Sequence, residues 1–194
     1  MTRTVTHLFD DYAQAQRAVE ALEQAGFSSS EISLVSRYRS DGSLADDASG
    51  AATGATVGGL AGGGVGLLAA LGVIAIPGIG PLVAAGVLAT TLASAAAGTV
   101  AGGLIGALVD YGVSEDDAHV YSEAVRRGGS LVSVRADDAR AAKAEQILDQ
   151  QTPVDVASRR QYYTQAGWSK YDPRAPGYTE EEIRKEREIY GRLR

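Results

Sequence analysis

The most constraining feature of this sequence is an uncharged stretch of sixty-two residues, from Ala48 to Val109, that holds sixteen of the 24 glycines. Within it, small residues recur at every fourth position in two series. These are Gly50, Gly54, Gly58, Gly62 and Gly66 in the first series, and Ser94, Gly98, Gly102 and Gly106 in the second. Because four residues are close to one helical turn, each series places a bare stripe along one face of a helix. Such stripes let two helix backbones approach closely, so we predict that they are the contact faces of two packed helices.

Residues 76–81 read Ile-Pro-Gly-Ile-Gly-Pro and predict the turn between these two helices. The first limb, residues 51–76, would be about 39 Å long and the second, residues 82–109, about 42 Å. Each limb is therefore long enough to cross a hydrocarbon core of about 30 Å. The sequence predicts a glycine-zipper helical hairpin that lies in a membrane or in the core of an oligomer.

Three environments are open for this hairpin. A membrane hairpin is favoured because eight glycines in the first limb would each cost about 1 kcal/mol in a helix exposed to water, whereas a bilayer forces backbone hydrogen bonds to form internally. The first alternative is a soluble hairpin that other copies of the chain cover, since a monomer would expose a large apolar patch. The second is a disordered low-complexity linker.

Composition sets further limits on function. The net charge of -6 argues against a general nucleic-acid binder, and the absence of cysteine excludes disulfides, thiolate nucleophiles and zinc–thiolate sites. The polar start of the chain predicts no secretory signal. Arginines on both sides of the hairpin (37, 39, 126 and 127) favour the cytoplasm for its two ends. We expect a protein at the cytoplasmic face of the inner membrane, or alternatively a cytoplasmic one.

The flanks of the uncharged stretch have a different, mixed pattern. Residues 5–9 and 31–38 alternate as strands around a helix that Asp11 caps and Gly26 ends. After the hairpin, residues 114–127 predict a helix, 130–136 a strand and 137–148 a second helix, while 153–159 are interpreted as a fourth strand. Together they predict an α+β, ferredoxin-like split β-α-β domain with the hairpin inserted.

A short internal echo supports this division, because a shift of 126 residues places Asp11 on Asp137 and Leu22 on Leu148. Chance similarity between two alanine-rich helices is the alternative. The predicted organisation is residues 1–38 as the first half of the α+β domain, 39–49 as a linker, 50–109 as the hairpin, 110–159 as the second half, and 160–194 as a tail.

The tail is rich in aromatic residues and ends in a charged helix. Five of the nine tyrosines and the single tryptophan lie after residue 160, and Thr179 with Glu182 forms a capping box for a helix over 180–190. The tail either packs its rings on the globular domain or docks on a partner or the membrane interface. We favour packing on the domain.

Chemistry-bearing residues are sparse. The glycine-rich stretch carries neither phosphate-binding pattern and no cation, which argues against nucleotide binding. Asp116, Asp117 and His119 lie together at a helix start, where aspartates serve the helix dipole rather than a metal. The pairs Asp10–Asp11 and Asp137–Asp138 are interpreted as helix caps at opposite ends of the sheet. The sequence predicts no catalytic, cofactor-binding or metal-binding residue, and no cofactor.

Two further groups of residues resemble a known family. Leu8-Phe9-Asp10-Asp11, Ala25-Gly26-Phe27 and Ile32-Ser33-Leu34-Val35 resemble the opening of bacterial heat-induced general stress proteins. The hairpin, residues 112–118 and residues 129–134 fit the same pattern, so the resemblance covers residues 3–157. It implies stress induction and membrane association, and it supplies no catalytic residues.

These observations lead to one leading hypothesis and one alternative. The leading hypothesis is a non-enzymatic general stress-response protein that associates with the inner membrane lipid or self-assembles as a homo-oligomer through the hairpin, without nucleic acid. The alternative is a soluble ligand-binding or scaffold module that oligomerises through the hairpin.

Overall fold

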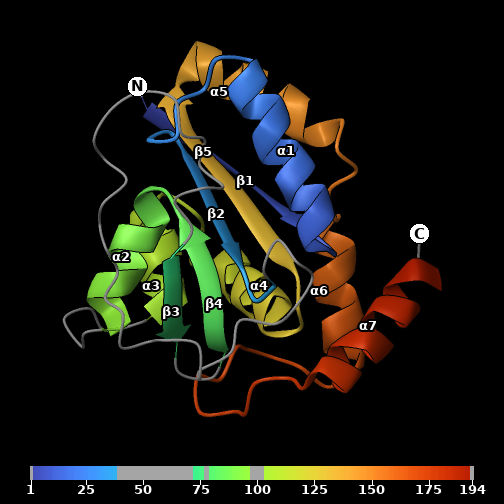
Figure 1. Cartoon of the computed structure of the whole chain (residues 1–194). Helices are drawn as coiled ribbons and strands as arrows, with labels where there is room; N and C mark the ends of the chain where they lie inside the picture. Colours follow the sequence, from blue (N-terminus) through green and yellow to red (C-terminus); the bar gives the residue numbers. More distant parts are fainter. Residues whose placement is uncertain (1, 39–71, 77–78, 97–102, 193–194) are drawn as a thin grey trace.

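The computed structural model describes residues 2–38, 72–76, 79–96 and 103–192. Within these ranges the chain forms one antiparallel sheet of five strands and seven helices, so the expected mixture of helices and antiparallel strands is confirmed. The strand order is β1-β5-β2-β4-β3 (Figure 1). The strands are β1 (Thr2–Phe9), β2 (Ile32–Ser36), β3 (Gly72–Ile76), β4 (Gly80–Ala85) and β5 (Ser130–Asp137).

The helices cover both faces of this sheet (Figure 1). They are α1 (Tyr12–Gln24), α2 (Val87–Ala96), α3 (Gly103–Asp110), α4 (Glu115–Arg126), α5 (Asp138–Asp149), α6 (Val156–Gln165) and α7 (Glu180–Arg192). α1 and α5 pack their buried apolar side chains on one face. α2, α3, α4 and α6 contribute to the apolar core on the other. The result is three layers with the sheet in the middle.

The central strand β5 lies between β1 and β2 and is antiparallel to both. Its side chains alternate, so that Leu131 belongs to the core under α4 while Val132 and Val134 belong to the core under α1 and α5. Phe9 lies opposite Ser130 and Thr2 opposite Asp137. This register confirms that the two aspartate pairs, which follow β1 and end β5, lie at opposite ends of the sheet.

Local capping signals hold where the sequence predicted them. The Asp11 carboxylate accepts from the Gln14 amide at 2.8 Å, Ser114 caps α4, and the Asp137 carboxylate accepts from the Arg140 amide at 3.0 Å. At α7 the box is complete, since the Thr179 amide donates to Glu182 at 2.8 Å and the Glu182 amide donates back to Thr179 at 3.3 Å. The four helix starts were thus readable from short-range chemistry.

The prediction of a fourth strand over 153–159 is wrong. Residues 156–165 form α6, which Asp155 caps by accepting from the Ser158 amide at 2.6 Å. Arg159 and Tyr163, four residues apart, are the buried side chains of this helix. A helix with one buried stripe is therefore the arrangement that buries both.

The glycine-rich region also departs from the predicted hairpin wherever it is described. Residues 72–76 and 80–85 pair as antiparallel strands around the turn expected to join two helices. The second limb is divided into β4, α2 and α3, and α2 packs against α3. Of the predicted contact positions, Ser94 lies in α2 and Gly106 in α3, whereas Gly98, Gly102 and the whole first series fall outside the described residues.

Gly86 is the residue that breaks this second limb. It has φ +80°, and a Cβ built on it would overlap the Ile32 carbonyl oxygen and approach Ser33 Cα to 2.9 Å. The backbone can therefore turn from β4 into α2 directly over β2, where the Ser33 hydroxyl accepts from the Leu88 amide at 3.2 Å. At this position, glycine serves a tight strand-to-helix turn rather than helix packing.

None of the helices formed by the described residues is both long enough and apolar enough to cross a membrane.

The C-terminal residues pack on the α4 end of the molecule, as favoured for the tail. Tyr163, Tyr171 and Tyr190 are all buried. Around them the fully buried Glu123 carboxylate binds Arg126 at 2.8 Å and Arg127 at 2.6 Å. Arg127 also binds Glu186 of α7 at 3.1 Å. The two carboxylates and two guanidiniums sum to zero charge, so the group is neutral as a whole.

Tyrosines and backbone carbonyls complete the surroundings of these arginines. The guanidinium of Arg127 lies 4.3 Å from the centre of the Tyr163 ring and that of Arg126 lies 5.3 Å from the Tyr178 ring. Arg37, at the end of β2, donates to the Arg126 carbonyl at 3.0 Å and to the Tyr178 carbonyl at 2.7 Å. A cation beside the last carbonyls of α4 complements the negative end of the helix dipole.

Replacing Gly86 with alanine tests the strand-to-helix turn. We expect Gly86→Ala to lower the free energy of unfolding by about 3 kcal/mol or more, because left-handed strain adds to a backbone overlap. Gly26→Ala is the matched control: Gly26 has φ +89° with nothing within 4 Å of a built Cβ, so it should lose only about 1 kcal/mol. Equal losses in urea denaturation would contradict the account.

Candidate functional site

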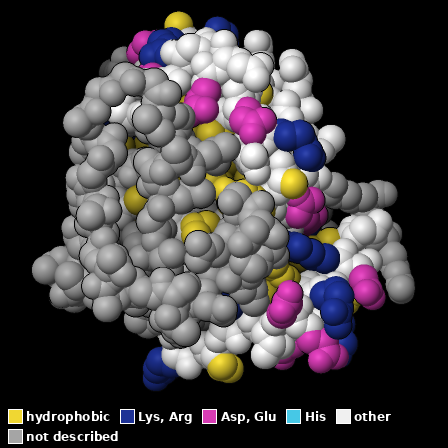
Figure 2. Space-filling model, in the orientation of Figure 1, with side chains coloured by type: hydrophobic (Ala, Val, Ile, Leu, Met, Phe, Trp, Pro, Cys, Tyr) yellow, Lys and Arg dark blue, Asp and Glu magenta, His cyan; other side chains and the backbone are white. Residues whose placement is uncertain are grey.

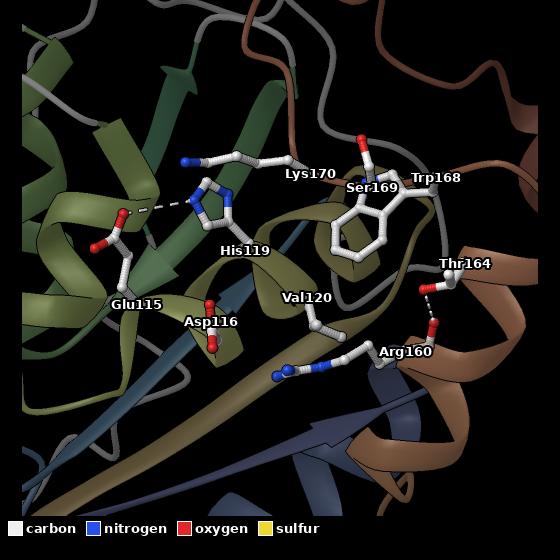
Figure 3. A pocket seen from close by; sticks show the side chains of 9 residues that line it. All are labelled: Glu115, Asp116, His119, Val120, Arg160, Thr164, Trp168, Ser169 and Lys170. Carbon is white, nitrogen blue, oxygen red and sulfur yellow. Dashed lines mark hydrogen bonds and ion pairs between the residues drawn. The ribbon is translucent and has the colours of Figure 1, made fainter.

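A small hollow lies between the first turns of α4, the helix α6 and the turn that follows α6 (Figure 3). Its volume is about 180 Å³. It is lined by Glu115, Asp116, His119, Val120, Arg160, Thr164, Trp168, Ser169 and Lys170. Three segments that are distant in the sequence thus supply its walls, and most of the lining side chains are polar or charged.

The α4 wall is fixed by the cap of that helix. Ser114 Oγ accepts from the Asp117 amide at 3.2 Å and donates to the Asp117 carboxylate at 2.6 Å. Asp117 in turn binds Arg160 of α6 at 2.6 Å. The capping role expected for Asp117 is confirmed, and the same carboxylate joins the two helices at the hollow. Asp116 and Glu115 stand in the first turn, where negative charge is favourable.

His119 lies one turn further along α4, with 11% of its side chain exposed. Its Nε2 is 3.9 Å from the Glu115 carboxylate, whereas its Nδ1 is buried without a hydrogen-bond partner among the described residues. Burial lowers the pKa of His119, nearby Lys170 lowers it further, and Glu115 and Asp116 oppose both effects. The ring is therefore neutral at pH 7 and can both donate and accept a hydrogen bond.

Trp168 supplies the opposite wall. Gly167, with φ +86°, makes the turn after α6, and the Trp168 amide donates to the Tyr163 carbonyl at 2.9 Å. The indole meets the buried Tyr163 ring edge-on, with centroids 5.7 Å apart. Its Nε1 is buried and, within the ranges given above, has no hydrogen-bond acceptor.

Charge is divided between the sides of the hollow. Glu115 and Asp116 come from α4, while Lys170 comes from the turn after Trp168 and Arg160 from α6 (Figure 3). Arg160 is partly neutralised by Asp117, which leaves Lys170 as the main cation opposite two carboxylates. Such an arrangement can bind a small molecule that carries both charges, with the ring nitrogens of His119 and Trp168 free to hydrogen-bond it.

A second hollow of about 420 Å³ lies where the start of β1 meets the end of α3. Its arginines already have partners: Arg3 binds Glu145, and the guanidinium of Arg135 lies 5.5 Å from the Tyr111 ring. It is the more open of the two, and we take the α4–α6 hollow as the candidate site.

Residues singled out in the sequence have diverse positions. None of the described glycine-series residues lines the α4–α6 hollow, and the groups of acidic and histidine side chains in the described ranges include none that could hold a metal ion. Asp11 and Asp137 cap helices as expected, but Asp10 does not, because it binds the buried Arg159 at 2.7 Å. That guanidinium must be neutralised, and Asp10 lies closest to it.

Arg160, Trp168 and Lys170 were not recognised as site residues from the sequence. The signal available was an aromatic residue flanked by polar ones just after a glycine, within the tail. Without knowledge that residues 156–165 form a helix beside α4, nothing connected that segment to His119.

Comparison of the chain with protein-family models, with curated proteins and with solved structures finds no match.

The lowered pKa of His119 gives a pH-dependent prediction. Since the unfolded chain takes up a proton near pH 6.5 and the folded chain only at lower pH, the free energy of unfolding should fall as the pH drops from 7 through 6. His119→Gln removes this proton uptake and should flatten that part of the profile. Chemical denaturation of both proteins at several pH values measures the difference; identical slopes would show that His119 titrates normally.

Proposed function

We propose that this chain is a non-enzymatic module that binds a small zwitterion in the hollow between α4 and α6. The observation that carries the proposal is the pairing of Glu115 and Asp116 on one side with Lys170 on the other, within a space of about 180 Å³. An ammonium group would lie by the carboxylates and a carboxylate by Lys170. The buried nitrogens of His119 and Trp168 would gain hydrogen-bond partners on binding.

We further infer that the sheet is built on a split β-α-β, ferredoxin-like plan. The order β1-β5-β2 and the packing of α1 and α5 on one face support this plan. The strand that would complete it beside β1 is replaced by a single backbone hydrogen bond, from the Val154 amide to the Leu8 carbonyl at 2.8 Å, after which α6 begins. α6 is thereby brought beside α4, where the hollow forms.

The arrangement of the uncharged stretch favours the ligand-binding alternative over the membrane hairpin. Leu82, Leu88, Leu92, Leu104 and Leu108 are buried in the core under α2, α3 and α4. In the described part of this stretch, apolar side chains thus cover the chain's own sheet. Self-association through residues 50–66, and the stress role that the family resemblance implies, stay predictions.

The proposal is tested with glycine betaine, which carries a quaternary ammonium and a carboxylate, and with choline and acetate, which each keep one of these charges. Trp168 is the single tryptophan, so its fluorescence reports on the hollow directly. We expect glycine betaine to change the emission at a lower concentration than either single-charge analogue. No saturable response to glycine betaine, or equal responses to all three, would contradict the proposal.

Variants assign the two charges of the ligand. Lys170→Met should weaken glycine betaine binding about tenfold, equivalent to roughly 1.4 kcal/mol, and leave choline binding unchanged. Asp116→Asn should weaken both ligands. The control is Lys143→Met on α5, an exposed lysine outside the hollow; a loss of affinity there as large as at Lys170 would mean that net charge, not the site, is responsible.

A further inference from the structure

We propose that α7 is a latch that holds the Trp168 wall of the α4–α6 hollow in place, so that release of α7 opens the hollow. The proposal rests on the proposed function for its biological meaning. Its physical content is a chain of contacts that runs from α7 through Tyr163 to Trp168.

The first contacts of this chain join α7 to α4. Glu186 binds Arg127 at 3.1 Å, and Arg187 donates to the Gly128 carbonyl at 3.1 Å while its guanidinium lies 4.2 Å from the Tyr38 ring. Gly128 has φ +90°, and a Cβ there would overlap the Ile183 side chain. α7 therefore lies directly on the end of α4, where a glycine makes room for it.

Tyr190 extends the chain from α7 to α6. Its ring is 3.6 Å from the Arg159 guanidinium and meets Tyr162 edge-on, with centroids 5.6 Å apart. Its hydroxyl donates to Glu186 and to the Tyr163 hydroxyl, the latter at 3.4 Å. Burial and the hydroxyl's donation to Glu186 are among the causes that raise the pKa of Tyr190, so the phenol stays protonated and remains a donor.

Tyr163 is the link to the hollow. Its side chain is completely buried between Arg127, Arg159 and the Trp168 indole. Its carbonyl accepts the Trp168 amide. The position of Trp168 is thus set by a tyrosine that Glu186 and Tyr190 of α7 hold from the other side.

α7 itself is suited to detach. Over residues 180–191, Ile183 and Tyr190 are the buried side chains, and the others are exposed or half-buried. Charged side chains of both signs cover the outward surface in the region of α7 (Figure 2). Residues 172–177 connect it to the Trp168 turn by a largely exposed Asp-Pro-Arg-Ala-Pro-Gly segment. Elements with few buried apolar contacts open at lower free energy than the rest of a fold.

The test measures the accessibility of Trp168 and needs no ligand. Acrylamide quenching of Trp168 fluorescence is compared in the full chain, in Glu186→Gln and in the matched control Glu188→Gln, an exposed glutamate on the same helix. We expect the quenching constant to rise about twofold in Glu186→Gln, because loss of the ion pair with Arg127 favours the detached state, and to stay unchanged in the control. Tyr190→Phe, which keeps the ring but removes both hydroxyl contacts, should act in the same direction.

The outcomes separate the latch from the binding proposal. If quenching is equal in the wild type, Glu186→Gln and Tyr190→Phe, the latch is wrong, whether or not glycine betaine binds. If quenching rises in both variants but the wild type does not bind glycine betaine, the latch stands and the ligand assignment fails. Circular dichroism of each variant verifies that α4 and the sheet stay folded; global unfolding of both would show that α7 is an integral part of the fold and would overturn the latch.

Discussion

The complete burial of Glu123 is the constraint on which the α4 side of this molecule depends. A carboxylate removed from water is costly unless cations and hydrogen bonds replace its hydration, and here Arg126 and Arg127 do so at 2.8 and 2.6 Å. Those arginines are themselves shielded by Tyr163, Tyr178 and Glu186, which all come from residues beyond 160. The C-terminal part of the chain is consequently part of the core, and α4 becomes an interior helix.

Elements defined by short-range signals were predictable from the sequence. Capping aspartates, Gly26 with its positive φ and the alternation in β5 identified β1, α1, β2, α4, β5 and α5. The glycine-rich region was not, because a spacing of four small residues has the same period whether it serves helix packing or results from glycines that perform unrelated tasks. Gly86 is the clearest case: its neighbour in space is the Ile32 carbonyl, more than fifty residues away in the sequence. α6 was mistaken for a strand because its buried stripe is formed by Arg159 and Tyr163, an arginine and a tyrosine whose burial depends on Asp10 and Tyr190.

The candidate site shows a similar division. The acidic first turn of α4 and His119 stood out in the sequence, and their capping chemistry was read correctly for Asp117. Trp168 and Lys170 belong to the hollow only because α6 lies beside α4 and Gly167 reverses the chain after it. Opposite charges on two walls are a property of tertiary packing, and the linear spacing of these residues contains no trace of it. The same packing connects the hollow to α7 through Tyr163.

The most direct test of this account is native-state hydrogen exchange of the full chain in which Glu123 is replaced by glutamine. Glu115→Gln, an exposed glutamate on the same helix, is the control. If the buried carboxylate organises the C-terminal residues, Glu123→Gln should lose about 3 kcal/mol of protection in α6, in α7 and in the second half of α4 together, since two arginines are left without their shared counterion. Unchanged protection in α6 and α7 would contradict the account, because it would mean that the tail is held by its aromatic contacts alone.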